Sequence, residues 1–165
     1  MFLTMYYVPD VENAWKSVYY LQNEVAFGEI VRGMHHWGAS LVIVMMFLHT
    51  LRVFFTGSYK KPRELNWIVG VGIFGVMMGL GFTGYLLPWD MKALFATKVG
   101  IEIAASVPFI GEYIKILLAG DSTILGAQTL TRFFAIHVFF LPAALFALLA
   151  AHFIMIRRQG ISGPL

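Results

Sequence analysis

Three stretches of the chain contain no Asp, Glu, Lys or Arg, and each is long and apolar enough to cross a membrane. They cover residues 33–51, 67–89 and 133–156, and every charged residue lies between or beyond them. A helix needs about 20 apolar residues to cross the hydrocarbon core of a bilayer. The pattern therefore predicts an all-α integral membrane bundle with three full transmembrane helices, in a single domain over residues 1–165.

Two further segments are too apolar to be free loops. Residues 1–8 are apolar and stop at Pro9, so we expect the end of an apolar first helix: either the chain begins inside that helix or its real start lies upstream. Between the second and third spans we expect a short helix over about 91–105, broken at Pro108. The next apolar residues recur at helical spacing and predict an amphipathic surface helix in the membrane interface: Ile110, Tyr113, Ile114, Leu117 and Leu118.

The connecting segments differ in charge, and this difference predicts the topology. Residues 52–66 hold four basic residues and one acidic residue, and residues 157–165 hold two arginines and no acid. Residues 9–32 hold four acidic and two basic residues. By the positive-inside rule, 52–66 and 157–165 face the cytoplasm, matrix or stroma, whereas 9–32 and 90–132 face the opposite, positive side. The first and third spans then run parallel to each other.

Composition excludes several classes of protein. The chain is 59% hydrophobic and 13% charged, whereas soluble domains have about 25% charged residues. The net charge of +3 comes from short clusters of basic residues in the loops, which does not favour a nucleic-acid partner. The chain has no cysteine, so it forms no disulfide, uses no catalytic thiolate and ligates no iron–sulfur cluster.

Four histidines lie in two spaced pairs within the charge-free spans. His35 and His49 are fourteen residues apart, and His137 and His152 are fifteen residues apart. With a turn of about 100° and a rise of about 1.5 Å per residue, each helix presents two imidazoles on one face, about 21 to 23 Å apart. Because the two helices run parallel, His35 is expected level with His137 near the positive side, and His49 level with His152 near the negative side.

This arrangement predicts two non-covalent, bis-histidine b-type haems. A single intramembrane histidine can simply hydrogen-bond to a neighbouring helix, but two matched pairs are hard to explain in that way, because buried polar groups in lipid are costly and usually functional. Two neutral imidazoles fill both axial positions of a haem iron, which favours electron transfer over oxygen chemistry. The four expected metal ligands are His35, His137, His49 and His152. His36 lies about 100° off the ligand face and is not expected to be a ligand.

Glycines and arginines add candidate cofactor-binding residues. Gly70 and Gly84 repeat the fourteen-residue spacing and are expected to let a flat macrocycle approach the backbone, although close helix packing also favours glycine. Arg32, Arg52 and Arg132 lie near the histidines. For these three, pairing with a haem propionate and ordinary snorkelling at the interface are equally supported.

Several segments resemble a known family. Residues 32–40, 84–90 and 130–137 are similar to the N-terminal half of cytochrome b, and the His137–His152 interval is similar to that of the shorter cytochrome b6. Two further segments also resemble cytochrome b6: residues 60–65 and 155–165.

The resemblance implies a subunit of a quinol:cytochrome c or quinol:plastocyanin oxidoreductase in an energy-transducing membrane, either a bacterial plasma membrane or a thylakoid. In that family, quinol is oxidised at the positive side and one electron goes to a Rieske iron–sulfur protein. The other passes through the low-potential haem, here held by His35 and His137. It continues through the second haem, held by His49 and His152, and reduces quinone at the negative side.

The resemblance also implies partners and a quinol pocket. The partners would be the Rieske protein, a C-terminal cytochrome b subunit like subunit IV, and a c-type cytochrome or cytochrome f, in a dimeric complex. The pocket maps onto Phe82, Ala96 and Val99. The family's proton-accepting Glu lies in a separate subunit, so the chain is not expected to be catalytically complete alone. Cytochrome b6 carries a further c-type haem attached through a cysteine, which the absence of Cys does not support here, and Met91 stands where Gln is usual.

Two other classes of function stay open on the sequence. A di-haem membrane anchor of another respiratory dehydrogenase would pass electrons without bifurcation, but it would lack the Gly-Tyr-x-x-Pro-Trp segment at residues 84–89. A proton-conducting membrane subunit that uses its histidines would bind no haem.

Overall fold

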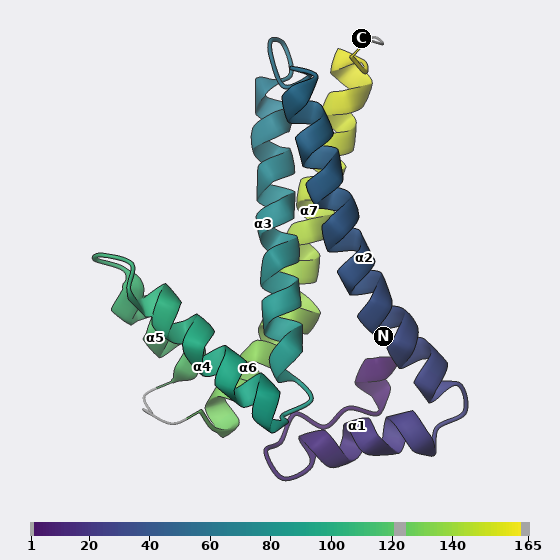
Figure 1. Ribbon diagram of the computed structural model, residues 1–165, viewed down its shortest axis with the longest axis vertical. Coiled ribbons are helices and arrows are strands. Elements are labelled where there is room, and N and C mark those ends of the chain that lie inside the picture. Colours follow the sequence, from purple (N-terminus) through teal and green to yellow (C-terminus); the bar gives the residue numbers. More distant parts are fainter. Residues whose placement is uncertain (1, 121–124, 163–165) are drawn as a thin grey trace. The chain divides into compact units, whose positions relative to one another are not determined.

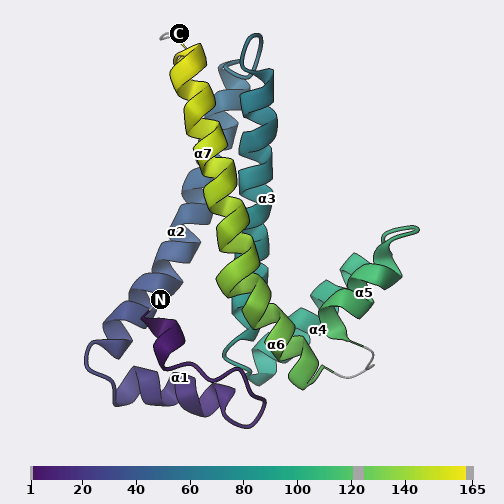
Figure 2. The ribbon, with the colours of Figure 1, turned by 180° about the vertical axis from the view of Figure 1, so that it is seen from behind.

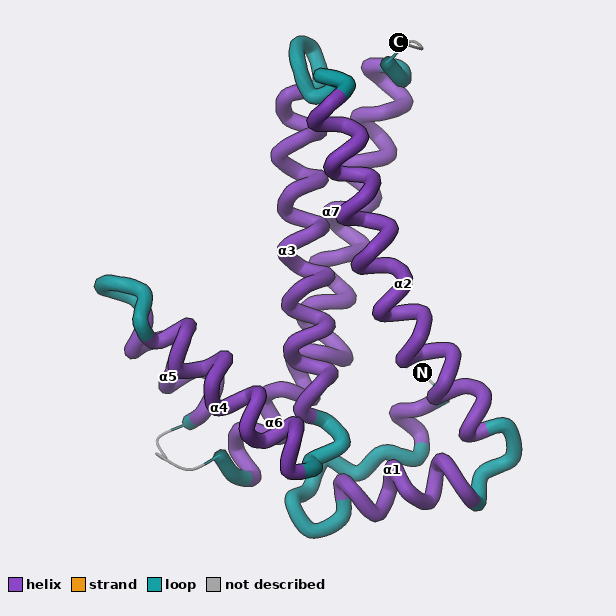
Figure 3. Tube along the Cα trace, viewed as in Figure 1, coloured by secondary structure: helices purple, strands orange, loops and turns teal. Residues whose placement is uncertain are grey.

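The computed structural model describes residues 2–120 and 125–162, and this part of the chain is helical with no strand (Figures 1 and 3). The helices able to cross a membrane are α2 (Gly28–Phe55), α3 (Glu64–Leu86) and the run Ala127–Gln159. The prediction of an all-α protein with three spanning helices is confirmed. α2 extends beyond the charge-free stretch 33–51, since it includes Glu29 in its first turn and Arg52 in its last turn. At these positions the two charges complement the helix dipole.

The spanning helices expose their apolar side chains. Buried residues make up none of the most apolar window of α2 and 6% of the corresponding windows of α3 and Ala127–Gln159. Soluble proteins rarely expose apolar surface on this scale, because its contact with water is costly. These faces are therefore suited to contact with lipid, with other membrane subunits or with an apolar cofactor.

The third span is not one continuous α-helix. It consists of α6 (Ala127–Ala135), the π-helical turn η2 (Ile136–Phe140) and α7 (Leu141–Gln159). Pro142 stands in the first turn of α7. A proline has no N–H to donate and its ring clashes with the carbonyl four residues earlier. The α-helical bonding pattern therefore fails just before Pro142, and the wider turn replaces it, a feature that the apolar pattern did not predict.

The chain divides into two compact units, which we describe separately. The first unit comprises the residues up to His36 together with Phe82–Val138, and the second comprises Trp37–Gly81 together with the residues from Phe139 onward.

The first unit holds the short helices. They are η1 (Leu3–Met5), α1 (Ala14–Asn23), α4 (Met91–Ala105) and α5 (Gly111–Ala119). The two helices expected between the second and third spans are thus present, with the break near Pro108. Asp90 caps α4 by accepting a hydrogen bond from the N–H of Ala93 at 2.8 Å, the usual way to satisfy a donor left over at a helix N-terminus.

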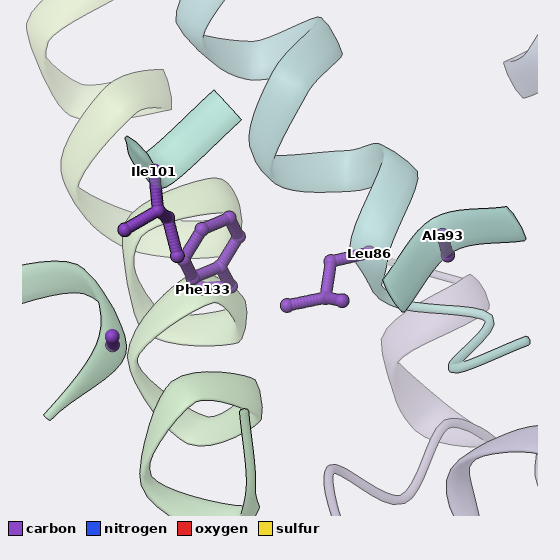
Figure 4. Close-up of a cluster of buried hydrophobic side chains, with 5 residues drawn as sticks. Leu86, Ala93, Ile101 and Phe133 are labelled. Atoms are coloured by element: carbon purple, nitrogen blue, oxygen red, sulfur yellow. The ribbon is translucent and has the colours of Figure 1, made fainter. Parts of the chain in front are cut away.

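A small apolar cluster forms the core of the first unit. Figure 4 shows side chains from the end of α3, from α4 and from α6 gathered there. Phe133 and Leu86 are completely buried in it. Partly buried neighbours, Phe82 among them, pack around the cluster, which consists of Leu86, Ala93, Ile101, Ala119 and Phe133.

Polar contacts fasten α5 to the helices on either side of it. The hydroxyl of Thr129 donates to the carbonyl of Ala119 at 2.9 Å, and Nη1 of Arg132 donates to the carbonyl of Leu117 at 2.9 Å. These bonds satisfy carbonyls that the end of a helix leaves without partners. Lys115 pairs with Glu102 of α4 at 3.0 Å, and this hydrogen bond raises the pKa of Lys115. The pair is exposed and stabilises the fold little.

Tyr7 anchors the N-terminal segment. Its hydroxyl donates to the carbonyl of Leu87 at 2.7 Å, and its ring stacks on Phe134 with centroids 5.4 Å apart. Burial raises the pKa of Tyr7, so the phenol keeps its proton and remains a donor over the physiological range.

In the second unit, segments of α2, α3 and α7 lie side by side in both views (Figures 1 and 2). The loop before α3 meets the C-terminal segment. Nε and Nη2 of Arg63 donate to the carbonyls of Gly160 and Ile161 at 3.2 and 3.1 Å, and the hydroxyls of Ser58 and Ser162 lie 2.9 Å apart. The two basic segments that the charge pattern assigned to one side of the membrane therefore touch each other.

The core cluster of the first unit provides a test of the fold. Phe133→Ala is expected to destabilise the protein by about 3–5 kcal/mol, because it opens a cavity at a fully buried side chain. Thermal unfolding of the purified protein in detergent, followed by circular dichroism, measures the loss. Phe146→Ala is the matched control, since Phe146 lies in α7 of the same helical run and is 73% exposed. Equal losses in the two variants would contradict the core described above.

Candidate functional site

The first pair of imidazoles lies in the first unit. His35 comes from α2 and His137 from the π turn η2, and their ring centroids are 6.1 Å apart with the planes at 83°. Two imidazoles that bind one metal from opposite sides hold their nitrogens about 4 Å apart, and the distance to the two ring centres adds roughly another 2 Å. The observed spacing therefore fits two axial ligands of one metal.

Gly84 of α3 forms a third side of this site. A Cβ at this position would stand 2.5 Å from Cε1 and 3.0 Å from Nδ1 of His137, closer than carbon atoms approach without displacing a neighbour. Only glycine leaves the imidazole in place. The structure thus puts Gly84 against a histidine of the first pair.

Thr83 also contacts His137, and the sequence analysis did not select it. Its hydroxyl oxygen lies 3.2 Å from Nδ1 of His137, and the side chain is 4% exposed. The signal that could have identified it is its position directly before Gly84 in an otherwise apolar helix.

The second pair lies in the second unit. It consists of His49 of α2 and His152 of α7. A Cβ on Gly70 would lie 3.4 Å from Cε1 and 3.8 Å from Nδ1 of His152, an ordinary contact. Within residues 2–120 and 125–162, the buried Nδ1 of His152 meets no side-chain partner, and the imidazole has a hydrogen bond with the backbone of Asn66.

The donor set of each pair fits a metal that is carried in a macrocycle. Over the described part of the chain, no three His, Cys, Asp or Glu side chains come together to hold a bare ion. Each pair offers two imidazoles, which suits a haem iron whose other four ligands come from the porphyrin. The glycine beside each pair leaves room for a planar group.

The three arginines have different surroundings. Nη1 of Arg32 donates to Oε1 of Gln22 at 2.6 Å, and Arg132 binds backbone carbonyls at the end of α5. Arg52 is exposed in the last turn of α2. Pairing of these side chains with propionates stays a prediction.

The residues expected in a quinol pocket divide between two faces of α4. Phe82 packs with Phe133, with ring centroids 5.6 Å apart, and presses on Gly100, where a Cβ would clash with its ring. Ala96 and Val99 lie on the exposed face of α4. The structure thus brings Phe82 against α4 at Gly100, which the sequence analysis did not select, and the place of Ala96 and Val99 in a quinol pocket stays a prediction.

Several of the remaining glycines of α3 pack against neighbouring helices, as the sequence suggested. Three of these glycines contact aliphatic side chains of neighbouring helices, as expected for close packing: Gly72 meets Leu148, Gly79 meets Leu141, and Gly81 meets Ile43. His36 is exposed on α2.

Comparison with known proteins connects this arrangement to a family. Residues 1–160 match the family described as Cytochrome b/b6/petB. The chain is 85% identical over all of its 165 residues to the menaquinol:cytochrome c reductase cytochrome b subunit of Geobacillus thermodenitrificans, covering 74% of that protein. It is 48% identical over 165 residues to cytochrome b6 of Heliobacterium mobile, covering 77% of it.

A solved structure agrees with these sequence matches. A chain of a hyperthermophilic respiratory Complex III matches 99% of this chain with a TM-score of 0.90 and 32% sequence identity. This chain spans 44% of that longer one. The chain therefore belongs to the cytochrome b/b6 family, and is a b-type haem protein integral to an energy-transducing membrane.

Proposed function

We propose that this chain binds two b-type haems without covalent attachment, one between His35 and His137 and the other between His49 and His152. Two observations carry the proposal: in the first pair an imidazole from α2 faces one from the third span, and in both pairs a glycine of α3 lies beside the histidine of the third span. For the first pair, the 6.1 Å between ring centroids matches the room that one metal needs.

A haem bound by two imidazoles supplies a one-electron Fe(III)/Fe(II) couple with no open position for oxygen. The residues of this chain determine where it binds and what surrounds it. His35 and His137 hold the iron in the first unit, His49 and His152 in the second, and Gly84 and Gly70 leave room beside them.

We infer that the chain is the cytochrome b subunit of a respiratory menaquinol:cytochrome c reductase. It would carry electrons from quinol oxidation at the positive side to a quinone site at the negative side. The choice of menaquinol and a c-type cytochrome rests on the 85% identical relative of that name. The partners would be a Rieske iron–sulfur protein, a C-terminal cytochrome b subunit and a c-type cytochrome, in a dimeric complex. Phe82, Ala96 and Val99 remain candidate quinol-pocket residues, and Arg32, Arg52 and Arg132 candidate partners of propionates.

Removing one ligand from each pair tests the haem assignment. In membranes that contain the assembled protein, a reduced-minus-oxidised spectrum should show a b-type α band, and potentiometric titration should resolve two components. His35→Ala is expected to abolish one component and His49→Ala the other, because one imidazole cannot hold the six-coordinate state alone. His36→Ala is the control and should keep both. An absent α band in the unaltered protein would instead favour a proton-conducting subunit.

The glycines of α3 give a graded test of the same sites. Gly84→Ala should disturb the component that depends on His35 by about 1–3 kcal/mol of binding free energy, because the added methyl overlaps His137. Gly70→Ala should have a smaller effect on the other component, since a Cβ there makes only ordinary contact. Haem content per protein measures both effects.

Gly75→Ala is the matched control on the same helix, because no described atom lies within 4 Å of a Cβ at this position. Equal haem loss in all three glycine variants would show that general helix packing, and not the haem sites, requires the glycines.

A further inference from the structure

The two histidines of the third span have different hydrogen-bond environments. Nδ1 of His137 lies 3.2 Å from the hydroxyl of Thr83, which is buried. Nδ1 of His152 is buried and meets no side-chain hydroxyl among the described residues, and the hydrogen bond of this imidazole is with the backbone of Asn66. The two candidate haem sites therefore differ in the group that meets the histidine, a side-chain hydroxyl in one and the backbone in the other, and such groups orient a histidine ligand.

The neighbouring side chains differ at one position of α3. Thr83 directly precedes Gly84, where a Cβ would meet Cε1 and Nδ1 of His137, and Val69 directly precedes Gly70, where a Cβ would meet the same two atoms of His152. Val69 and Thr83 are fourteen residues apart, so each holds the same position relative to its glycine. The side chains have nearly the same shape, but only threonine offers an oxygen.

We propose that Thr83 is a positioning residue that lowers the reduction potential of the haem held by His35 and His137. This inference rests on the proposed function, because it assumes that the iron binds these two imidazoles. The hydroxyl of Thr83 accepts a hydrogen bond from Nδ1–H of His137 and leaves Nε2 as the nitrogen that binds the metal. A helical threonine hydroxyl commonly donates to a carbonyl of the preceding turn, and a hydroxyl that donates can still accept a hydrogen bond through its lone pairs.

The direction of the effect follows from the basicity of the ligand. A hydrogen bond from Nδ1–H makes the imidazole a stronger donor to the metal. A stronger donor stabilises Fe(III) relative to Fe(II), and this lowers the midpoint potential of the couple. The Val69 side chain offers no hydroxyl to His152, whose hydrogen bond is with the backbone of Asn66.

Thr83→Val removes the acceptor and keeps the shape of the side chain. The midpoint potential of the component that His35→Ala abolishes should rise, and the other component should not move. A tenfold change in the relative affinity of the site for Fe(III) and Fe(II) corresponds to about 59 mV in a one-electron couple. Thr83→Ser keeps a hydroxyl and should restore the original potential. Titration of membranes that contain the assembled complex measures the change without any activity assay.

Val69→Thr is the reciprocal variant. It places a hydroxyl at the same position relative to His152 that Thr83 has relative to His137, and it should lower the potential of the component that His49→Ala abolishes. Low-temperature electron paramagnetic resonance should show altered g values for that haem alone, because ligand orientation changes with the new hydrogen bond. An unchanged potential for that component would contradict the role of the hydroxyl.

The outcomes separate this inference from the proposed function. If both haems are present and neither Thr83→Val nor Val69→Thr shifts a potential, the role of Thr83 is overturned while the proposed function stands. If the unaltered complex shows no b-type α band, both are overturned. Thr83→Val could also lose the haem altogether. In that case, a haem retained by Thr83→Ser supports the hydrogen bond. Loss of the haem from both variants, together with an unchanged potential in Val69→Thr, contradicts the hydrogen bond.

Discussion

An imidazole inside a membrane costs free energy unless its ring nitrogens have partners, because no water is available to supply them. This constraint governs the arrangement of the spanning helices. In the first unit, His35 and His137 face each other across 6.1 Å, with Thr83 at Nδ1 of His137 and Gly84 beside it. Lipid could not pair these nitrogens. Under the proposed function, a haem iron would satisfy one nitrogen on each ring, and the cofactor would then contribute to the fold as well as to the function.

The π turn η2 affects how His137 is placed in the third span. His137 and His152 are one residue further apart than His35 and His49. A π-helical hydrogen bond encloses one residue more than an α-helical bond, so the turn takes up the extra residue at His137. Pro142 causes the turn, since its ring excludes the α-helical bond to the carbonyl before it. A proline would weaken an ordinary spanning helix. Here Pro142 follows the turn that carries His137 and so affects the position of that imidazole.

The first unit combines the candidate site with the helices outside the membrane. The core around Leu86 and Phe133 joins the ends of α3 and α6 to α4 and α5, and Tyr7 ties the N-terminal segment to the carbonyl of Leu87. These contacts hold the residues on either side of Gly84 and His137. Packing in the short helices therefore stabilises the ends of the spans that carry the ligands, and a quinol pocket near Phe82 would share that rigidity.

The sequence alone determined what depends on periodicity and charge. Charge-free spans, the pairing of His35 with His137 and the glycines at the same spacing follow from helix geometry and the cost of polar groups in lipid, and the pairing of His49 with His152 stays a prediction on the same grounds. Tertiary structure decided what depends on packing across helices: the π turn at Pro142, the contact of Thr83 with His137, the engagement of Arg132 by α5, and the contact of Phe82 with α4 at Gly100. Periodicity gives the face on which a side chain lies, but its neighbour on that face is known only once the helices have packed.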